Sequence, residues 1–279
     1  MSEIIEASGR LRKMPVVAQR PVGYTLRVGD HELPLNDLLG RTIEIRFSGE
    51  IRCIHCDRKT RKSFGQGYCY PCFKRLAACD SCIMSPEKCH YHLGTCREPE
   101  WGETHCMTGH VVYLANSSGL KVGITRASQV PTRWIDQGAV TAVPVLRVAS
   151  RYLAGLVEVA CKQHVADRTN WRTMLRGAAP DIDLVAERKA LLARIAPELE
   201  QLAAEHGHDT IEVAVDPVWS LDYPVASWPD KIRTHNLDKE PVASGVLQGI
   251  KGQYLMLDTG VINIRKYTAY HVRVRVLSE

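Results

Sequence analysis

The sequence predicts an α+β protein, with a small mixed sheet and helices, a zinc module of ribbon or knuckle type, and small all-β elements at both ends. Three observations predict this class. Nine of the ten cysteines fall between Cys53 and Cys106, short runs that alternate apolar and polar residues occur at both ends of the chain, and helical periodicity lies between them. We expect four modules, at residues 1–52, 53–110, 111–206 and 207–279.

The composition is that of a globular protein. Of the 279 residues, 45% are hydrophobic and 24% are charged. There is no apolar run long enough to span a membrane, and the first twenty residues are mixed and charged rather than a signal peptide. We therefore expect a cytoplasmic protein with no membrane partner. The net charge of +5 allows a polyanionic partner without requiring one.

Residues 1–52 are expected to form a small β module. The runs VGYTLRV and TIEIRF, which start at residues 22 and 42, alternate as half-buried strands do, with turn signals at Gly29-Asp30 and Ser48-Gly49. Because so few short strands cannot close a barrel alone, we expect them to pair with strands of the C-terminal module.

Residues 53–110 hold few large aliphatic side chains, so something other than apolar burial must fold them. Two C-x-x-C pairs, separated by twelve residues, supply the four thiolates that tetrahedral zinc takes as ligands. The predicted ligands are Cys53, Cys56, Cys69 and Cys72. A redox role would require a thioredoxin-like helix start, which the sequence does not suggest. We expect a closed structural site without catalysis.

A second zinc site is expected from the later cysteines and histidines of this module. Its predicted ligands are, in chain order, Cys79, Cys82 and Cys89, with His92, Cys96 or Cys106 as the fourth. Cys79 and Cys82 form another knuckle, whereas the spacing does not decide among the three candidates for the last ligand.

The loop between the first two knuckles, DRKTRKSFGQGY, is basic and carries two aromatic residues. Its cationic residues are Arg58, Lys59, Arg61 and Lys62. Such a loop can hold a phosphate backbone and stack a base, or it can be a solvated loop tip. The first alternative predicts DNA or RNA as a partner.

Residues 111–125, VVYLANSSGLKVGIT, are predicted to be two strands joined by a polar turn. Strand alternation places Val112 and Leu114 on one face, and Tyr113, Lys121 and Gly123 on the other. One face is therefore apolar, while the other offers a phenol, an ammonium group and a glycine.

The remaining segments predict helices and then further strands. An apolar stripe over residues 151–167 includes His164 as a core residue and leaves Glu158 pointing away from its centre. The pattern at 181–206 predicts a packing helix that Pro197 kinks or breaks. Residues 207–279 are predicted to form several strands joined by glycine turns, as in a small barrel.

The hairpin and the helices after it resemble the GIY-YIG endonuclease superfamily. The runs Val111-Val112-Tyr113 and Lys121-Val122-Gly123 stand where that family has G-I-Y and Y-I-G. The run PTRW places Arg133 at the arginine of the family's first helix, Glu158 matches its metal-binding glutamate, and Asn170 matches an asparagine beyond that helix. The resemblance implies a GIY-YIG-like α+β domain over about 111–176.

The same resemblance implies a divalent-metal-dependent endonuclease that hydrolyses phosphodiester bonds. It implies that Glu158 holds Mg²⁺ or Mn²⁺, that Arg133 stabilises developing charge, and that Tyr113 positions or activates water. Lys121 stands where the family has its second tyrosine, and a lysine there would contact phosphate or transfer a proton. The departure also fits a protein that binds nucleic acid and no longer cuts it.

The whole chain also resembles a zinc-containing bacterial family of unknown function. The cysteine block, CREPEWG at 96–102 and GIKGQY at 249–254 carry this resemblance, which names no activity. We therefore expect a zinc-stabilised nucleic-acid-processing enzyme. The alternatives are a DNA- or RNA-binding protein with a degenerate GIY-YIG-like domain and a zinc-scaffolded protein-interaction module. The sequence leaves the oligomeric state open.

Overall fold

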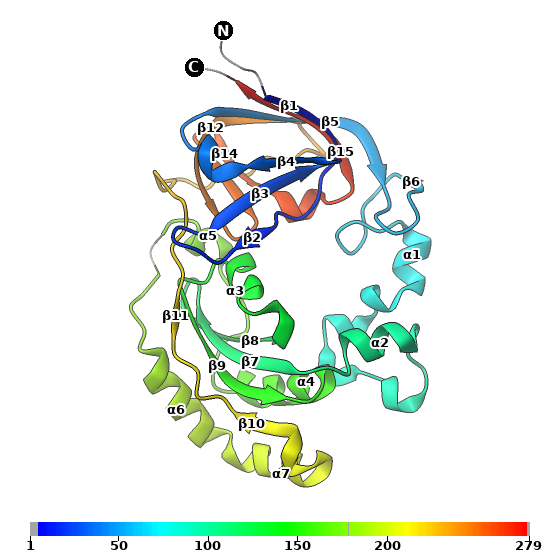
Figure 1. Cartoon of the computed structure of the whole chain (residues 1–279), viewed down its shortest axis with the longest axis vertical. Helices are drawn as coiled ribbons and strands as arrows, with labels where there is room; N and C mark the ends of the chain where they lie inside the picture. The colour runs from blue at the N-terminus through cyan, green and yellow to red at the C-terminus, as the bar shows by residue number, and fades with distance from the viewer. Residues whose placement is uncertain (1–4, 178, 278–279) are drawn as a thin grey trace. The chain divides into compact units, whose positions relative to one another are not determined.

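A computed structural model describes residues 5–177 and 179–277, which group into two compact units (Figure 1). Unit 1 comprises Met1–Lys74, Leu175–Gly177 and Leu221–Glu279, and unit 2 comprises Arg75–Met174 and Ala178–Ser220. The first four and last two residues, which the predicted terminal modules include, lie outside the described residues. The division into four modules stays a prediction, because compactness by contacts is a different criterion from independent folding.

The main element of unit 1 is a seven-stranded sheet with the order β1-β15-β5-β12-β13-β14, in which β6 also pairs with β5. The strands are β1 (Ile5–Arg10), β5 (Thr42–Arg52), β6 (Lys59–Thr60), β12 (Val242–Lys251), β13 (Tyr254–Leu257), β14 (Gly260–Asn263) and β15 (Tyr270–Leu277). A smaller sheet contains β2 (Val16–Val17), β3 (Gly23–Val28) and β4 (His31–Pro34). The remaining elements are η1 (Leu35–Leu38), α1 (Tyr70–Arg75) and η8 (Ile264–Tyr267).

The expected pairing of N-terminal with C-terminal strands is confirmed. Ile5 of β1 lies opposite Val276 of β15, and β5 lies between β15 and β12. Alternation explains the burial along β15, where Val274 is buried while Arg273 and Arg275 are exposed. The sheet therefore joins residues from the two ends of the chain.

The turn predicted at Ser48-Gly49 is wrong, because β5 continues through both residues to Arg52. Gly49 has a φ of +84°, and the register between β5 and β15 shifts at this point. A glycine accommodates this backbone conformation without a steric penalty, so the sequence signal marks a β-bulge instead of a turn.

Unit 2 is built on a five-stranded sheet with the order β10-β9-β7-β8 and β11 paired with β9. The strands are β7 (His110–Asn116), β8 (Leu120–Arg126), β9 (Thr141–Val148), β10 (Ile211–Val213) and β11 (Trp219–Ser220). The helices are α2 (Pro99–His105), α3 (Thr132–Asp136), α4 (Arg151–Lys162), α5 (Trp171–Met174), α6 (Leu184–Arg194) and α7 (Ala196–His206). Single 3₁₀ turns are η2 (Ala77–Cys79), η3 (Ser81–Ile83), η4 (Pro86–Lys88), η5 (Tyr91–Leu93), η6 (Ala127–Gln129) and η7 (His208–Thr210). The predicted α+β class is confirmed.

The two faces of this sheet carry different helices. On one face, Val112 and Leu114 belong to the apolar core that also contains Leu153 of α4 and Leu191 of α6. Helix α3 lies over the opposite face (Figure 1), where the Trp134 ring packs 5.8 Å from the Tyr113 ring, centroid to centroid. The predicted polar face of the hairpin is therefore covered.

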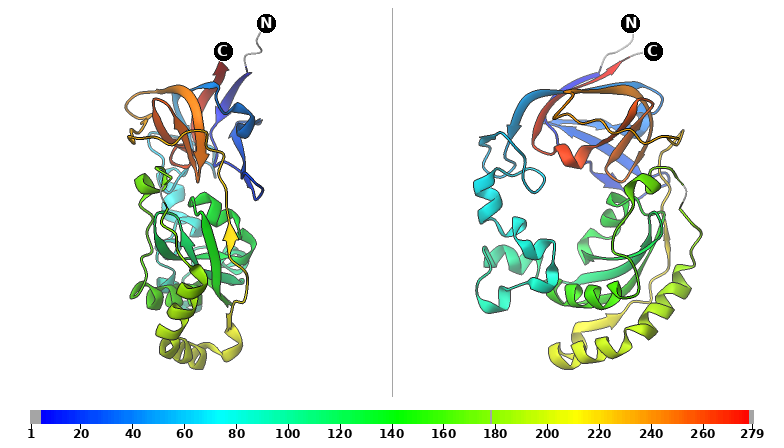
Figure 2. Two further views of the ribbon diagram at one scale, coloured as in Figure 1. Left: turned by 90° about the vertical axis from the view of Figure 1, so that its left-hand side faces the viewer. Right: turned by 180° about the vertical axis from the view of Figure 1, so that it is seen from behind.

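The helix predicted at 181–206 breaks into α6 and α7, as Pro197 suggested, and the bend between them is visible in Figure 2. The helix predicted at 151–167 begins after the N-cap Ser150 and ends at Lys162. Because it ends there, His164 is exposed instead of lying in the core, while Val165, the next residue of the predicted stripe, is buried in it. Among the described residues, no helix combines the length and the apolar character needed to cross a membrane.

Candidate metal and active sites

The four cysteines of the first two knuckles converge in unit 1. The sulfur atoms of Cys53, Cys56, Cys69 and Cys72 all lie within 4.8 Å of one another. The Sγ atoms of Cys56 and Cys69 are 3.7 Å apart. Four sulfurs about 2.3 Å from a tetrahedral zinc lie about 3.8 Å from each other, so this group has the dimensions of a zinc tetrathiolate. The cluster can hold a zinc ion, as predicted.

The environment of these thiols favours a bound cation. Burial alone would raise the pKa of Cys53, but backbone N–H groups, including those of Cys56 and Cys69, donate to its sulfur and lower the pKa to about 6. Burial, and after it the neighbouring thiols, raise the pKa of Cys72 to about 12. Four thiolates this close repel one another, so the fully ionised set requires a metal ion.

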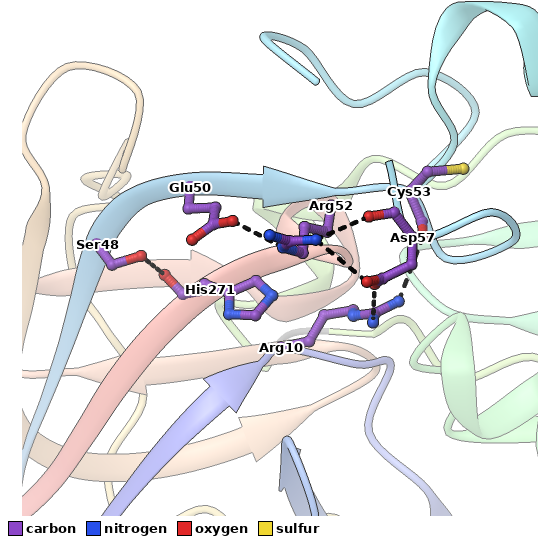
Figure 3. A network of polar contacts seen from close by, with 7 residues as sticks. All are labelled: Arg10, Ser48, Glu50, Arg52, Cys53, Asp57 and His271. Atoms are coloured by element: carbon purple, nitrogen blue, oxygen red, sulfur yellow. Dashed lines mark hydrogen bonds and ion pairs between the residues drawn. The ribbon is translucent and has the colours of Figure 1, made fainter. Parts of the chain in front are cut away.

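Two arginines fasten the first knuckle to the sheet (Figure 3). The guanidinium of Arg10 donates to the carbonyl oxygen of Cys53 and lies 2.5 Å from Oδ1 of Asp57. Arg52 donates to the backbone oxygen of Asp57 at 3.1 Å and to Oδ2 at 3.2 Å, and also pairs with Glu50. The knuckle is thereby held at the end of β5.

The four cationic residues predicted to bind nucleic acid are all exposed on the loop between the knuckles. Lys59 and Arg61 line a cavity of about 660 Å³ together with Phe47. The Nζ atom of Lys62 lies 5.5 Å from the centre of the Phe64 ring. The loop therefore presents cations beside aromatic rings, while Arg58 stands exposed next to the first knuckle.

The later cysteines lie in unit 2, among the turns η2 to η5 and helix α2. Ligand atoms of Asp80, Cys82 and His90 lie within 4.8 Å of one another. However, Oδ2 of Asp80 also pairs with Arg97 at 2.7 Å, and its Oδ1 accepts from Ser81 N. The Asp80 carboxylate is thus already engaged by an arginine and a backbone amide.

Four thiols in this region are electrostatic neighbours. Burial, and after it the charges of Asp80 and of the thiols of Cys89, Cys106 and Cys96, raise the pKa of Cys82 to about 11. Burial also raises the pKa of Cys106, which Cys89 and Cys96 raise further while Arg151 lowers it. These charge effects do not select the fourth ligand among His92, Cys96 and Cys106, which stays open.

Two other predicted ligands occupy different surroundings. His92 is exposed on η5, with its ring 5.6 Å from the Tyr152 ring of α4. Cys79 ends η2 and is half-buried. Their participation in a metal site stays a prediction.

The polar face of the hairpin forms a compact group with the side-chain amide of Gln137. We call Tyr113, Lys121 and Gln137 the Gln137 cluster. Oε1 of Gln137 accepts from the Tyr113 hydroxyl at 2.9 Å and from Lys121 Nζ at 2.5 Å. Tyr113 is fully buried and Lys121 nearly so. Burial raises the pKa of Tyr113 to about 12 and lowers that of Lys121 to about 8.

Gly123 lies directly opposite Tyr113 in the ladder between β7 and β8. A Cβ atom on this glycine would be 2.7 Å from the Tyr113 hydroxyl oxygen, closer than any real contact. The glycine therefore makes room for the tyrosine ring that lies across it.

Gly123→Ala should lower the free energy of unfolding by about 1–3 kcal/mol, because the tyrosine ring must shift in a packed interior. Gly109→Ala is the matched control, since a Cβ at Gly109 meets no atom within 4 Å and Gly109 has no unusual φ. Urea unfolding of both variants measures the difference. Equal stability of the two variants would contradict the close approach.

Arg133 of α3 and Glu158 of α4 act on the charges of this cluster. Arg133 lowers the pKa of Tyr113 against the effect of burial, and its charge adds to the lowering of the Lys121 pKa. Glu158 of α4 opposes that lowering, as does Asp167. The residues that the resemblance selected in the hairpin and in both helices thus influence one another.

Glu158 already has a cationic partner. Lys162, one helical turn later, places Nζ 3.2 Å from Oε2 of Glu158 and 3.3 Å from Oδ2 of Asp167. The Glu158 side chain is 13% exposed, against 34% for Lys162. The sequence analysis missed both this lysine and Gln137, although the i, i+4 spacing of Glu158 and Lys162 is a recognisable signal.

Asn170 has a structural position. Its Oδ1 accepts from the backbone N–H groups of Arg172 and Thr173, so it caps the short helix α5. Its own N–H donates to Ser118 in the hairpin turn at 2.9 Å. Asn170 therefore ties α5 to the hairpin, and its predicted catalytic role stays a prediction.

Comparison with protein families identifies the kin of this chain. A family described as "Protein of unknown function (DUF2797)" matches residues 40–272. The chain belongs to this family. The DUF2797 match includes both groups of cysteines and the whole Gln137 cluster. Comparisons with curated proteins and with solved structures found no match.

Proposed function

We propose that the protein is a zinc-stabilised, nucleic-acid-processing endonuclease of GIY-YIG type, which hydrolyses phosphodiester bonds at the Gln137 cluster of unit 2. One observation carries the proposal. The tyrosine, lysine, arginine and glutamate that the resemblance selected act on one another's charge around a shared amide. Tyr113 and Lys121 come from the hairpin of β7 and β8, Arg133 from α3 and Glu158 from α4, in the order that the resemblance implies.

The environments of these groups support distinct roles. Arg133 carries a permanent positive charge beside the cluster, suited to a phosphate whose charge grows in the transition state. Tyr113, with a pKa of about 12, keeps its proton and is suited to donate a hydrogen bond. Lys121, with a pKa of about 8, is neutral in about a tenth of the molecules at pH 7 and in about half at pH 8, and this neutral form is suited to accept a proton.

The carboxylates of Glu158 and Asp167 offer oxygen donors to a divalent cation near this cluster. Carboxylate oxygen is the ligand that Mg²⁺ and Mn²⁺ prefer, so the donor set fits. When bound, such an ion would neutralise charge on the scissile phosphate. Lys162 now lies between the two carboxylates, so a cation there must compete with its ammonium group.

Lys162→Met should therefore raise the affinity for Mn²⁺ about tenfold, because removing a charge about 4 Å away is worth about 1 kcal/mol or more even in water. Lys189→Met, an exposed lysine on α6, has the same charge change and should leave the affinity unchanged. Isothermal titration calorimetry measures both. Unchanged affinity in Lys162→Met would show that the ion does not bind between these carboxylates.

We also propose a second structural zinc site, with Cys82 and Cys89 as ligands and the others drawn from the neighbouring cysteines and histidines. The effect of the Cys89 charge on Cys82 supports this pair, and among the described residues the ligand atoms of Asp80, Cys82 and His90 lie within 4.8 Å of one another. The turns that carry these residues also have little apolar core. Such a site would supply the folding free energy that burial does not. Arg151, beside Cys106 and Cys82, would offset part of the negative charge of a tetrathiolate.

The direct test of the proposed activity uses the zinc-loaded protein with single-stranded, duplex and branched DNA and RNA in Mg²⁺ or Mn²⁺. We expect metal-dependent cleavage that chelation of the divalent ion stops. If the protein binds these substrates but cuts none of them, the endonuclease proposal is wrong.

The second candidate function is binding without cleavage. The burial of Tyr113 and Lys121 and the pairing of Glu158 with Lys162 favour it, because each withholds a reactive group from solvent. The exposed cations of the loop between the first two cysteine pairs (residues 57–68, the zinc loop) would then supply the affinity for nucleic acid. Binding that weakens steeply with salt, with no cleavage product, would support this candidate over the first.

A further inference from the structure

Unit 1 contains a polar cavity beside the zinc loop. The cavity has a volume of about 290 Å³ and lies between that loop and the 3₁₀ turn η8. Its lining residues are Ser63, Gln66, Asn263, Arg265 and Lys266. All five are polar, two are cationic and none is acidic. A cavity with this lining favours an anion over a cation or an apolar molecule.

Hydrogen bonds join the two walls of the cavity. Nε of Arg265 donates to Oε1 of Gln66 at 2.6 Å, which fixes the guanidinium relative to the zinc loop. On the other wall, Oδ1 of Asn263 accepts from the backbone N–H of Lys266 and shapes η8. Arg265 is therefore presented on a built wall, while Nζ of Lys266 donates to the Tyr267 hydroxyl at 3.1 Å and lies 3.8 Å from Oδ2 of Asp238, so a bound anion would share this ammonium group with them.

Ser63 provides an independent observation. Its hydroxyl oxygen is buried, and no hydrogen-bond partner for it exists among the described residues. A buried hydroxyl without a partner costs about 1–3 kcal/mol, so such groups are usually satisfied by a ligand or by water. Ser63 lines the cationic cavity, and a rotation of its side chain would turn the enclosed hydroxyl toward an anionic oxygen.

We propose that this cavity binds a phosphate group, with Arg265 and Lys266 as its charge partners and Ser63 as a hydrogen-bond donor. The guanidinium matches the geometry of phosphate oxygens, and the hydroxyl adds a directed bond. The volume is at the lower limit of small-ligand pockets, which suits a phosphate with an adjoining sugar and not a large cofactor. A nucleoside monophosphate and a phosphate of an oligonucleotide share this chemistry.

The site depends on the first zinc centre. Ser63 and Gln66 lie on the loop that Cys56 and Cys69 close. Packing of the Phe64 ring against Tyr70 and Phe73, at 5.4 and 5.8 Å between centroids, also orders this loop. Phosphate binding should therefore require zinc, which gives the metal a role beyond stability. The inference is independent of the proposed hydrolysis, because every residue of the cavity belongs to unit 1.

The experiment measures binding of inorganic phosphate, a nucleoside monophosphate and a short single-stranded oligonucleotide to the zinc-loaded protein by calorimetry. Arg265→Gln should weaken phosphate binding about tenfold, and Ser63→Ala about fivefold. Arg273→Gln, an exposed arginine on β15, is the control for net charge and should have no effect. The nucleoside monophosphate and the oligonucleotide distinguish a mononucleotide from a polymer as the source of the phosphate.

Ser63→Ala also separates a ligand role from a structural one. Because the hydroxyl has no partner in the described part of the protein, its removal should leave thermal stability equal or slightly higher while phosphate binding falls. Three outcomes would overturn the proposal: no phosphate binding by the zinc-loaded protein, equal weakening by Arg273→Gln and Arg265→Gln, or a Ser63→Ala variant that binds normally.

Discussion

Cys69→Ser should release one zinc ion per chain and unfold the loop between the knuckles. Structural zinc sites in small modules contribute about 10–16 kcal/mol of binding free energy at neutral pH, comparable with or larger than the whole stability of a typical domain. Serine cannot replace the thiolate, so the remaining three sulfurs would hold the metal far more weakly. Elemental analysis of the purified protein, together with thermal unfolding, measures the loss.

Two further cysteine variants make this experiment decisive. Cys161 belongs to the apolar core of unit 2, in which none of the proposed zinc ligands lies, so Cys161→Ala should keep the full zinc content. Cys89→Ser should remove a different zinc ion, so wild type, Cys89→Ser and the double variant with Cys69→Ser should hold two, one and no zinc ions. Equal zinc content in Cys69→Ser and Cys161→Ala would contradict the first site. A wild-type protein with one zinc would contradict the second.

Local sequence patterns predicted the features that depend on residues close together in the chain, such as the face of a strand on which a side chain lies. Alternation in residues 111–125 placed Val112 and Leu114 in the core and Tyr113 with Lys121 on the other face, which is confirmed. A side chain's face is set by the two-residue period of the strand. The close spacing of Cys56 and Cys69 within paired knuckles likewise predicted their convergence, because a short loop closes at little entropic cost.

These local patterns could not predict how segments far apart in the sequence pack against one another. The same alternation could not indicate that α3 covers the polar face, because this depends on where Trp134 packs in three dimensions. The partner of Tyr113 is Gln137, twenty-four positions later, and no period connects them. His164 was placed in the core by extending a helical stripe past the residue at which α4 ends, and helix ends are set by local capping and tertiary contacts.

The cavity beside the basic turn η8 could not be predicted either, because its two walls come from distant parts of the sequence. Arg265 and Lys266 carried no motif, and their significance comes from Gln66 and Ser63, about two hundred residues earlier in the chain. Only the pairing of N-terminal with C-terminal strands brings the two segments into one unit. A binding site assembled across such a distance has no signature in a single sequence.

Glu158→Gln should abolish metal-dependent cleavage, with a loss of about a hundredfold or more, while the fold is kept. The amide has the shape of the carboxylate but lacks the charge that holds a divalent cation. Arg133→Ala should cause a loss of about 10²–10³-fold, because it removes a fixed positive charge from the site of phosphate transfer. The free energy of unfolding of either variant should fall by only about 1 kcal/mol, since both side chains are half-buried.

Matched variants on the same unit separate loss of chemistry from general damage. Glu200→Gln on α7 and Arg194→Ala at the end of α6 make the same chemical changes at exposed positions, and both should cleave at the wild-type rate. Nucleic-acid affinity measured without divalent metal should also stay within about threefold of wild type for Glu158→Gln, because salt-dependent affinity comes from basic residues. If Glu158→Gln cleaves as fast as Glu200→Gln, Glu158 does not hold the catalytic ion. The reactive centre must then be sought away from the Gln137 cluster, whose shared hydrogen bonds would serve stability alone.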